Sequence, residues 1–337
     1  MSRYFRHRWL LHVLLLAAVL TASCAAPRTP DGGEDAGKLN VVATTTFVAD
    51  VVSHIGGERI NLQTLLPYGA NPHSYQPSPQ DVAAVNQADV IFANGAGLEI
   101  FLEELIDNAG GDADVVPVSE RVELRSFNLQ GGGGPDHEQG ETDAQDGSKP
   151  HQEDGSEDGE LQGVDPHVWF DPTNVMVWVE NIQETLVRLD PENEEQYREQ
   201  ARSYRSELER LDAWIREQVA DIPENNRYFV TDHTVFGYFA EEYGFQQVGA
   251  VIPAATTEAE PSGKHLAQLS DIIREYDVKA IFVSKDFDPS LSRRIAEDTG
   301  VEVVPLYFGS LTEDDGPAGT YISFMRYNVE AILGALK

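Results

Sequence analysis

The sequence contains one cysteine, Cys24, among 337 residues, so a disulfide within one molecule is impossible. Basic residues are also scarce, because 24 Lys and Arg against 57 Asp and Glu give a formal charge of -33. Such a charge repels nucleic acid and anionic membrane surfaces, and it attracts cations without selecting among them. Nucleic acid is therefore not an expected partner. The hydrophobic content of 41% is sufficient to fill cores, and the length favours two domains.

The apolar run near the N-terminus, from Trp9 to Leu20, is too short for a comfortable transmembrane span and follows three arginines. This pattern predicts a signal peptide over residues 1–23. The residues before Cys24 are similar to a bacterial lipoprotein signal, which implies that Cys24 becomes the lipidated N-terminus of the mature chain. The alternative is a secretory signal without lipidation, in which case Cys24 would be an unmodified thiol with no assigned role. Residues 24–38 are polar and predict a flexible tether.

Beyond residue 39, short apolar runs rich in β-branched residues alternate with stretches whose apolar residues have helical spacing. The expected strands are Leu39–Ala43, Ile60–Leu66, Asp89–Ala93, Val115–Val118, Arg227–Thr231, Gln246–Ile252, Ala280–Val283 and Glu302–Leu306. This alternation is typical of parallel sheets with helices on both faces. The sequence thus predicts an α/β fold with two lobes, 39–190 and 222–337, and a cleft between them.

Two further segments have a distinctive composition. An apolar stripe at steps of three and four residues predicts one long helix within 191–221 that joins the lobes. Residues 130–164 begin with glycines, are rich in Asp and Glu and contain His137 and His151, but have no aromatic residue. They predict a disordered loop in the first lobe. The two histidines are auxiliary metal ligands in one interpretation, and the whole segment is a solvated acidic spacer in the other.

Three histidines occur in comparable settings, each beside an apolar run. His73 lies in NPHSYQPSP, His167 lies in DPHVWFDP, and His233 follows the run Tyr228–Val230. Ligand groups in parallel α/β folds gather at the carboxyl ends of strands, so we expect the three imidazoles to form one site that bridges the lobes. Neutral imidazole is a preferred ligand of Zn²⁺. We expect His54 and His265 to be structural or exposed.

Several motifs in this order carry a resemblance to a known family: NPHSYQPSPQDVAAVNQADVIFANGAGLE, DPHVWFDP, TDH-x-x-FGYFAEEYG, TEAEPS and TYISFMRYNVEAI. Residues 39–337 are similar to the zinc- and manganese-binding lipoproteins of bacterial ABC importers, the cluster A-I solute-binding proteins. The resemblance implies two lobes on one rigid helix, with the metal held between them by His73, His167 and His233. Zinc-type members have His at the third position and manganese-type members commonly have an acid. Zinc is thus the expected ion, with Mn²⁺ as the alternative.

The same resemblance implies an extracytoplasmic monomer, anchored to the membrane through Cys24 or periplasmic, whose partner is the membrane permease of the importer. Two positions depart from the family pattern. Gly309 stands where the family often has a carboxylate ligand, which leaves the fourth ligand open between water and an acid elsewhere. Lys285 stands where the family tends to have Glu.

A zinc hydrolase is the alternative from another class, because three histidines and an open position also describe a catalytic site. The sequence has neither HExxH nor GxSxG. Glu258 and Glu260 are possible general bases, but TEAEPS is more simply a polar entry to the next helix. We therefore expect a binding protein and no enzyme. An adhesin function has no separate support in the sequence.

Overall fold

The computed structural model describes residues 37–126, 163–257 and 259–337. Leu39–Lys337 form one compact unit that contains two four-stranded sheets, and all strand pairs within both sheets are parallel. The strands of the first sheet, in spatial order, are β2 (Ile60–Thr64), β1 (Leu39–Ala43), β3 (Val90–Ala93) and β4 (Asp114–Pro117). Those of the second are β6 (Gln246–Ile252), β5 (Tyr228–His233), β7 (Ala280–Ser284) and β8 (Glu302–Leu306). The predicted α/β fold is confirmed.

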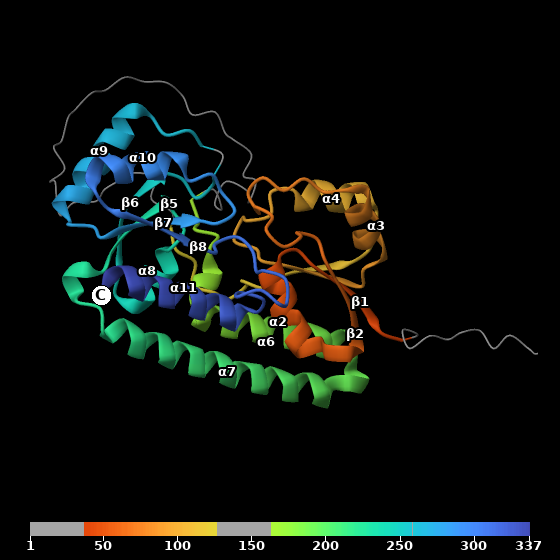
Figure 1. Ribbon diagram of the computed structural model, residues 1–337. Helices are drawn as coiled ribbons and strands as arrows, with labels where there is room; N and C mark the ends of the chain where they lie inside the picture. Colours follow the sequence, from red (N-terminus) through yellow and green to blue (C-terminus); the bar gives the residue numbers. More distant parts are fainter. Residues whose placement is uncertain (1–36, 127–162, 258) are drawn as a thin grey trace, which may run out of the picture. The chain divides into compact units, whose positions relative to one another are not determined.

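Helices cover both faces of each sheet (Figure 1). The α-helices are α2 (Thr46–Gly56), α3 (Pro79–Gln87), α4 (Leu102–Ala109), α6 (Pro172–Leu189), α7 (Glu194–Ala220), α8 (Gly237–Tyr243), α9 (Gly263–Glu275), α10 (Ser290–Thr299) and α11 (Tyr321–Leu336). Short 3₁₀ turns are η1 (Gly57–Arg59), η2 (Val168–Phe170), η3 (Pro191–Asn193) and η4 (Glu224–Asn226). In the second sheet, Ile281 packs with α9 and α10, whereas its neighbour Phe282 packs with α8 and α11. This alternation of side chains buries both faces of the sheet.

Local capping explains the starts of α3 and α6 and corrects one prediction. Ser78 and Asp81 form a capping box at the start of α3, with Pro79 in the first turn. The sequence suggests Thr173 as the cap of the next helix, but this is wrong. Asp171 caps α6, and its carboxylate accepts hydrogen bonds from the Thr173 amide and hydroxyl, both at 2.7 Å. A carboxylate there also complements the positive end of the helix dipole.

The sequence predicts a helix from Leu98 to Ile106, but α4 begins four residues later, at Leu102. The turn before it is longer than expected because Ala96 adopts a φ of 54° between two glycines of positive φ. The Glu99 carboxylate accepts hydrogen bonds from the amides of Asn94 (2.7 Å) and Gly95 (3.0 Å) and thereby closes this turn.

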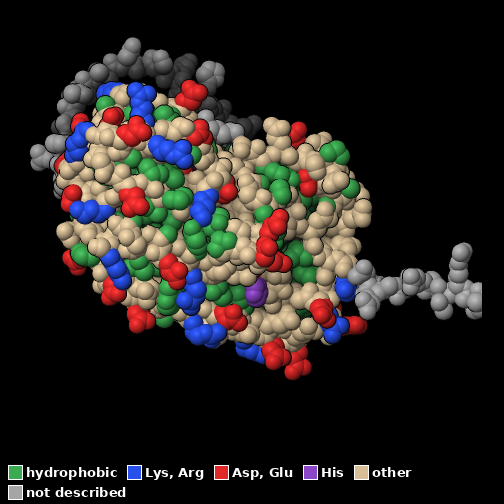
Figure 2. Space-filling view, in the orientation of Figure 1, with side chains coloured by type: hydrophobic (Ala, Val, Ile, Leu, Met, Phe, Trp, Pro, Cys, Tyr) green, Lys and Arg blue, Asp and Glu red, His purple; other side chains and the backbone are tan. Residues whose placement is uncertain are grey.

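The long helix α7 has 27 residues, about 40 Å at 1.5 Å per residue, and follows η3. The residues of the predicted apolar stripe are all buried: Tyr197, Ala201, Tyr204, Leu208, Leu211, Ile215 and Val219. The helix contacts α2 and α6 from the first lobe and α11 from the second, and it runs beneath both sheets (Figure 1). Its outer face carries interspersed acidic and basic side chains (Figure 2), including the pairs Arg198–Glu194 and Arg216–Asp212.

The two lobes share a continuous aromatic core beneath the cleft. Phe47 of α2 stacks on Trp169 of η2 at a ring-centroid distance of 5.1 Å and contacts Phe324 of α11 at 4.8 Å. Phe170 meets Phe236, from the loop before α8, at 4.5 Å. Such dense packing between the lobes favours small relative movements over a wide hinge opening.

The limits 39–190, 191–221 and 222–337 assigned to the lobes and the linking helix stay a prediction, and we use them as names for these parts. Residues 1–36, which include the predicted signal peptide, lie outside the described residues, as do residues 127–162, which include most of the acidic segment. At its described end, Val164 forms an isolated antiparallel bridge with Ser126. Among the described helices, none has the length and apolar character needed to cross a membrane.

Candidate metal centre

His73 lies in the loop between β2 and α3, which the prolines of NPHSYQPSP keep out of a helix. The side-chain carbonyl of Asn71 accepts a hydrogen bond from the His73 amide at 3.0 Å. The Asn71 amide group donates to the Thr257 hydroxyl at 2.7 Å, across the cleft in the second lobe. His73 is half-buried and the next residue, Ser74, is exposed, so this loop lies at the rim of the site.

His167 precedes η2 and is 1% exposed. One carboxylate oxygen of Asp165 accepts from both the His167 amide (3.0 Å) and its Nδ1 (2.8 Å). This bond leaves Nε2 free to act as a ligand, and it fixes the ring orientation.

His233 is the last residue of β5 and is 4% exposed. The sequence predicts a strand that ends at Thr231, but the strand runs two residues further and carries His233 itself to the carboxyl edge of the sheet. Asp232 Oδ1 accepts from the His233 amide (2.7 Å) and from its Nδ1 (2.6 Å). Asp232 Oδ2 accepts from the amide of Ser284, at the end of β7, at 2.6 Å.

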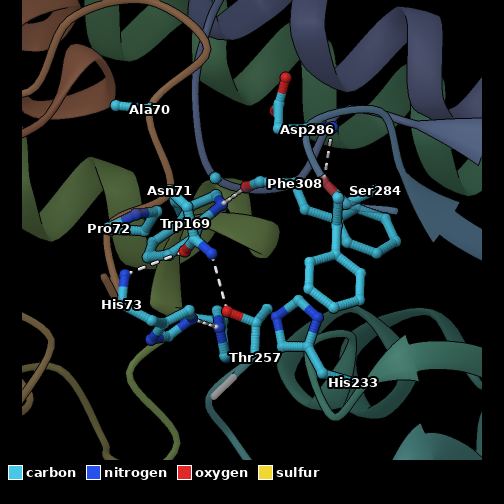
Figure 3. Close-up of a pocket in the computed structure, with 13 residues that line it drawn as sticks. Ala70, Asn71, Pro72, His73, Trp169, His233, Thr257, Ser284, Asp286 and Phe308 are labelled. Carbon is cyan, nitrogen blue, oxygen red and sulfur yellow. Dashed lines mark hydrogen bonds between the residues drawn. The ribbon is translucent and has the colours of Figure 1, made fainter. Parts of the chain in front are cut away.

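The structure brings the three predicted histidines together. Figure 3 shows two of them, His73 and His233, at the pocket. One ring nitrogen of each of the three lies within 4.8 Å of the others, and the Nε2 atoms of His73 and His167 are 3.2 Å apart. Burial and the two neighbouring imidazoles lower the pKa of His73 to about 2. Burial also lowers the pKa of His167. These two rings are therefore held neutral at physiological pH, which is the form that binds a metal.

Asp165 and Asp232 were not identified as site residues from the sequence. The sequence nevertheless contains a pattern that could have identified them. Asp165 lies two residues before His167, in DPH, and Asp232 lies directly before His233, in DH. Carboxylates that orient metal-binding imidazoles in this way are a general feature of metal sites. His73 differs, since its orientation depends on the loop and on Asn71 rather than on a carboxylate.

The rest of the pocket wall is largely apolar and includes Trp169 and Phe308. The Trp169 indole donates to the Phe308 carbonyl at 3.1 Å and thus connects the lobes beneath the imidazoles. Asp286 is the acidic residue on this wall, but its carboxylate points away from His73 and His233 (Figure 3). In this structure the Asp286 carboxylate is therefore not in a position to act as a fourth metal ligand.

Gly309 also lines the pocket. A Cβ atom at this position would lie 2.8 Å from Pro72 Cδ, so a side chain has no room beside the His73 loop in this arrangement.

His54 and His265 lie elsewhere, as expected. His54 stacks on Tyr204 at a ring-centroid distance of 4.1 Å, and His265 Nε2 is 2.8 Å from the Ala250 carbonyl oxygen. Lys285, the other departure from the family pattern, donates to the Tyr327 hydroxyl at 2.7 Å and lies over the rings of Tyr307 and Tyr327. Cys24, His137, His151 and Glu258 lie outside the described residues.

Two parallel-sheet lobes joined by one long helix, with imidazoles from both lobes in the cleft, define the architecture of a metal-binding solute receptor. The family model ZnuA, described as the periplasmic component A of a zinc-uptake complex, matches residues 41–335. The chain therefore belongs to this family, the metal-binding solute-binding proteins of ABC importers.

Individual relatives agree with this membership. The chain is 33% identical over 325 residues to the manganese-binding lipoprotein MntA of Halalkalibacterium halodurans, covering 96% of this chain and 97% of that protein. It is 31% identical over 336 residues to the manganese ABC transporter substrate-binding lipoprotein PsaA of Streptococcus anginosus, with 97% of each covered. The structure of the periplasmic zinc-binding protein TroA of Treponema pallidum superimposes with a TM-score of 0.74 and 26% identity, covering 89% of this chain and 99% of TroA.

Proposed function

We propose that this protein captures Zn²⁺ on the outer side of the cytoplasmic membrane and delivers it to an ABC importer, with His73, His167 and His233 as the metal ligands. The observation that carries the proposal is the convergence of three imidazole nitrogens within 4.8 Å. No carboxylate among the described residues of the pocket wall points at them.

The donor set supports zinc over manganese. Zn²⁺ is bound well by three imidazoles in a tetrahedral arrangement, whereas Mn²⁺ prefers carboxylate, carbonyl and water oxygens. The named relatives include manganese-binding lipoproteins, the zinc-binding TroA and the zinc-uptake family model, so the family contains both kinds of receptor. In this chain Gly309 offers no side chain, and water completes the coordination of Zn²⁺.

The same proposal includes an anchor and a partner. MntA is named as a lipoprotein and PsaA as the substrate-binding lipoprotein of a manganese ABC transporter, which supports lipidation at Cys24 and a membrane permease as the partner. The monomeric state is part of this proposal. His137 and His151 are proposed as auxiliary metal ligands that collect zinc. Catalysis is not part of the proposal, since Asp165 and Asp232 are engaged with imidazoles and do not serve as general bases.

The proposal is tested by titrating the metal-stripped mature chain separately with Zn²⁺ and Mn²⁺ by calorimetry. We expect one tight zinc site and weak manganese binding, both retained after deletion of residues 131–163. His73→Ala, His167→Ala and His233→Ala should each lower zinc affinity by orders of magnitude, and the matched control His265→Ala should not. Tighter manganese binding, or equal losses in all four variants, would overturn it.

A further inference from the structure

The three imidazoles differ in how they are held, and this difference suggests how the metal leaves. His167 and His233 are 1% and 4% exposed, and each is bonded to a buried carboxylate. His73 is half-buried and lies on a loop near the rim. The aromatic core that joins the lobes lies beneath the first two histidines. Metal release through the rim requires movement of the His73 loop and leaves this core intact.

Two hydrogen bonds cross the cleft from this loop. The Gly69 amide donates to the Ser310 hydroxyl at 2.8 Å, and Ser310 is 2% exposed. The second bond, from the Asn71 amide group to the Thr257 hydroxyl, joins two half-buried residues at 2.7 Å. Both bonds are thus only partly buried, because Gly69 is exposed although Ser310 is not, and water competes for their groups.

Asn71 occupies a special position because one side chain makes both relevant contacts. Its carbonyl oxygen holds the His73 amide, and its NH₂ group holds Thr257 in the opposite lobe (Figure 3). When the bond to Thr257 is lost, the Asn71 side chain can rotate, and this side chain also accepts the hydrogen bond that positions the His73 backbone. Closure of the cleft and placement of the third ligand are thus coupled through a single planar group.

We propose that Asn71 and Thr257 form a latch that sets the rate at which the metal leaves, with Asn71 as a positioning residue for His73. This proposal rests on the proposed metal site. Zinc bound to His167 and His233 remains attached while the latch opens, and it escapes once His73 withdraws. Breaking the latch therefore speeds release, and the fold of the metal-free chain is retained.

The test is the zinc release rate of the mature chain, measured by stopped-flow mixing with excess chelator. Asn71→Ala, the isosteric Thr257→Val and the double variant are compared with the control Asn61→Ala. The control removes a side-chain bond from Asn61 of β2 to Asn40 of β1 at 3.2 Å, at a distance from the cleft. We expect Thr257→Val to release zinc roughly three to ten times faster, the effect of one neutral hydrogen bond. Asn71→Ala, which also loses the bond to the His73 amide, should release zinc at least as fast. The double variant should be no faster than Asn71→Ala, and thermal unfolding of the metal-free latch variants should change by no more than the small amount expected for one or two partly exposed hydrogen bonds.

Several outcomes would overturn the latch. Release at the wild-type rate would do so, and so would effects that multiply in the double variant, because the two residues would then act independently. An equal acceleration by Asn61→Ala would show a general loosening instead. Different results would overturn the proposed function itself: a wild-type chain without a tight zinc site, or a His233→Ala variant that keeps the tight site.

Discussion

Replacement of Asp232 by Asn should weaken zinc binding through the geometry of its three hydrogen bonds. The two carboxylate oxygens of Asp232 accept from the His233 amide, from His233 Nδ1 and from the Ser284 amide, all at 2.6 or 2.7 Å. Asn has one carbonyl oxygen, so at least one of these N–H donors must face an NH₂ group. The residue is 2% exposed, and water has little access to relieve the mismatch.

The size of the effect follows from general magnitudes. A buried donor left without an acceptor costs about 1–3 kcal/mol, and loss of the partner that orients a metal-binding histidine lowers affinity by about 10- to 100-fold. We therefore expect Asp232→Asn to raise the zinc dissociation constant by about 10- to 100-fold, or about 1.4–2.7 kcal/mol. The metal-free protein should also lose about 1–3 kcal/mol of its free energy of unfolding.

Asp165→Asn is the matched comparison. A single oxygen of Asp165 accepts both bonds from His167, at 3.0 and 2.8 Å, so the carbonyl oxygen of Asn can replace it without a mismatch. Loss of the charge alone weakens these bonds by about 1 kcal/mol, which predicts an affinity loss of about fivefold. Competition titration against a chromophoric chelator measures both variants. Equal losses would refute the argument, because charge and not acceptor geometry would then govern both histidines.

Three further predictions concern the rim and the protonation of the site. Metal-stripped protein should lose thermal stability as the pH falls below about 6.5, because burial lowers the pKa of His73 to about 2 and the unfolded chain binds the additional proton. This loss should be smaller in His73→Ala, and equal slopes of Tm against pH would contradict the assignment. Gly309→Ala should weaken zinc binding about tenfold, because the new methyl group would meet Pro72 Cδ at 2.8 Å and displace the His73 loop; unchanged affinity in a competition titration would show that the loop yields freely. Asp286→Asn should change the affinity by no more than about threefold, as should the exposed control Asp288→Asn, because neither carboxylate is a ligand; a loss of orders of magnitude at Asp286 alone would make it the fourth ligand.

The elements of the fold were predictable where the pattern is local. Leu39–Ala43 and Gln246–Ile252 are strands with the predicted limits, because β-branched runs end at polar or proline residues there. The start of α4 was not predictable, since it depends on how Glu99 bonds to the backbone of the preceding turn. Spacing alone does not contain that information.

The candidate site divides in the same way. Proline and strand context indicated His73, His167 and His233, and the parallel-sheet rule predicted that they meet. The contacts that complete the site join residues far apart in the sequence, such as Asn71 with Thr257 and Trp169 with Phe308. These pairs follow from the packing of two lobes, and no local pattern in one sequence specifies them.

The continuous buried stripe of α7 has a consequence for the ways in which this protein can vary. Each residue added to an α-helix turns everything after it by about 100° and advances it by about 1.5 Å. An insertion of one residue in the middle of α7 would point Ile215 and Val219 away from the second lobe while Tyr197 and Ala201 still face the first. Loops between strands can change length one residue at a time, but the length of this helix is constrained by both lobes at once.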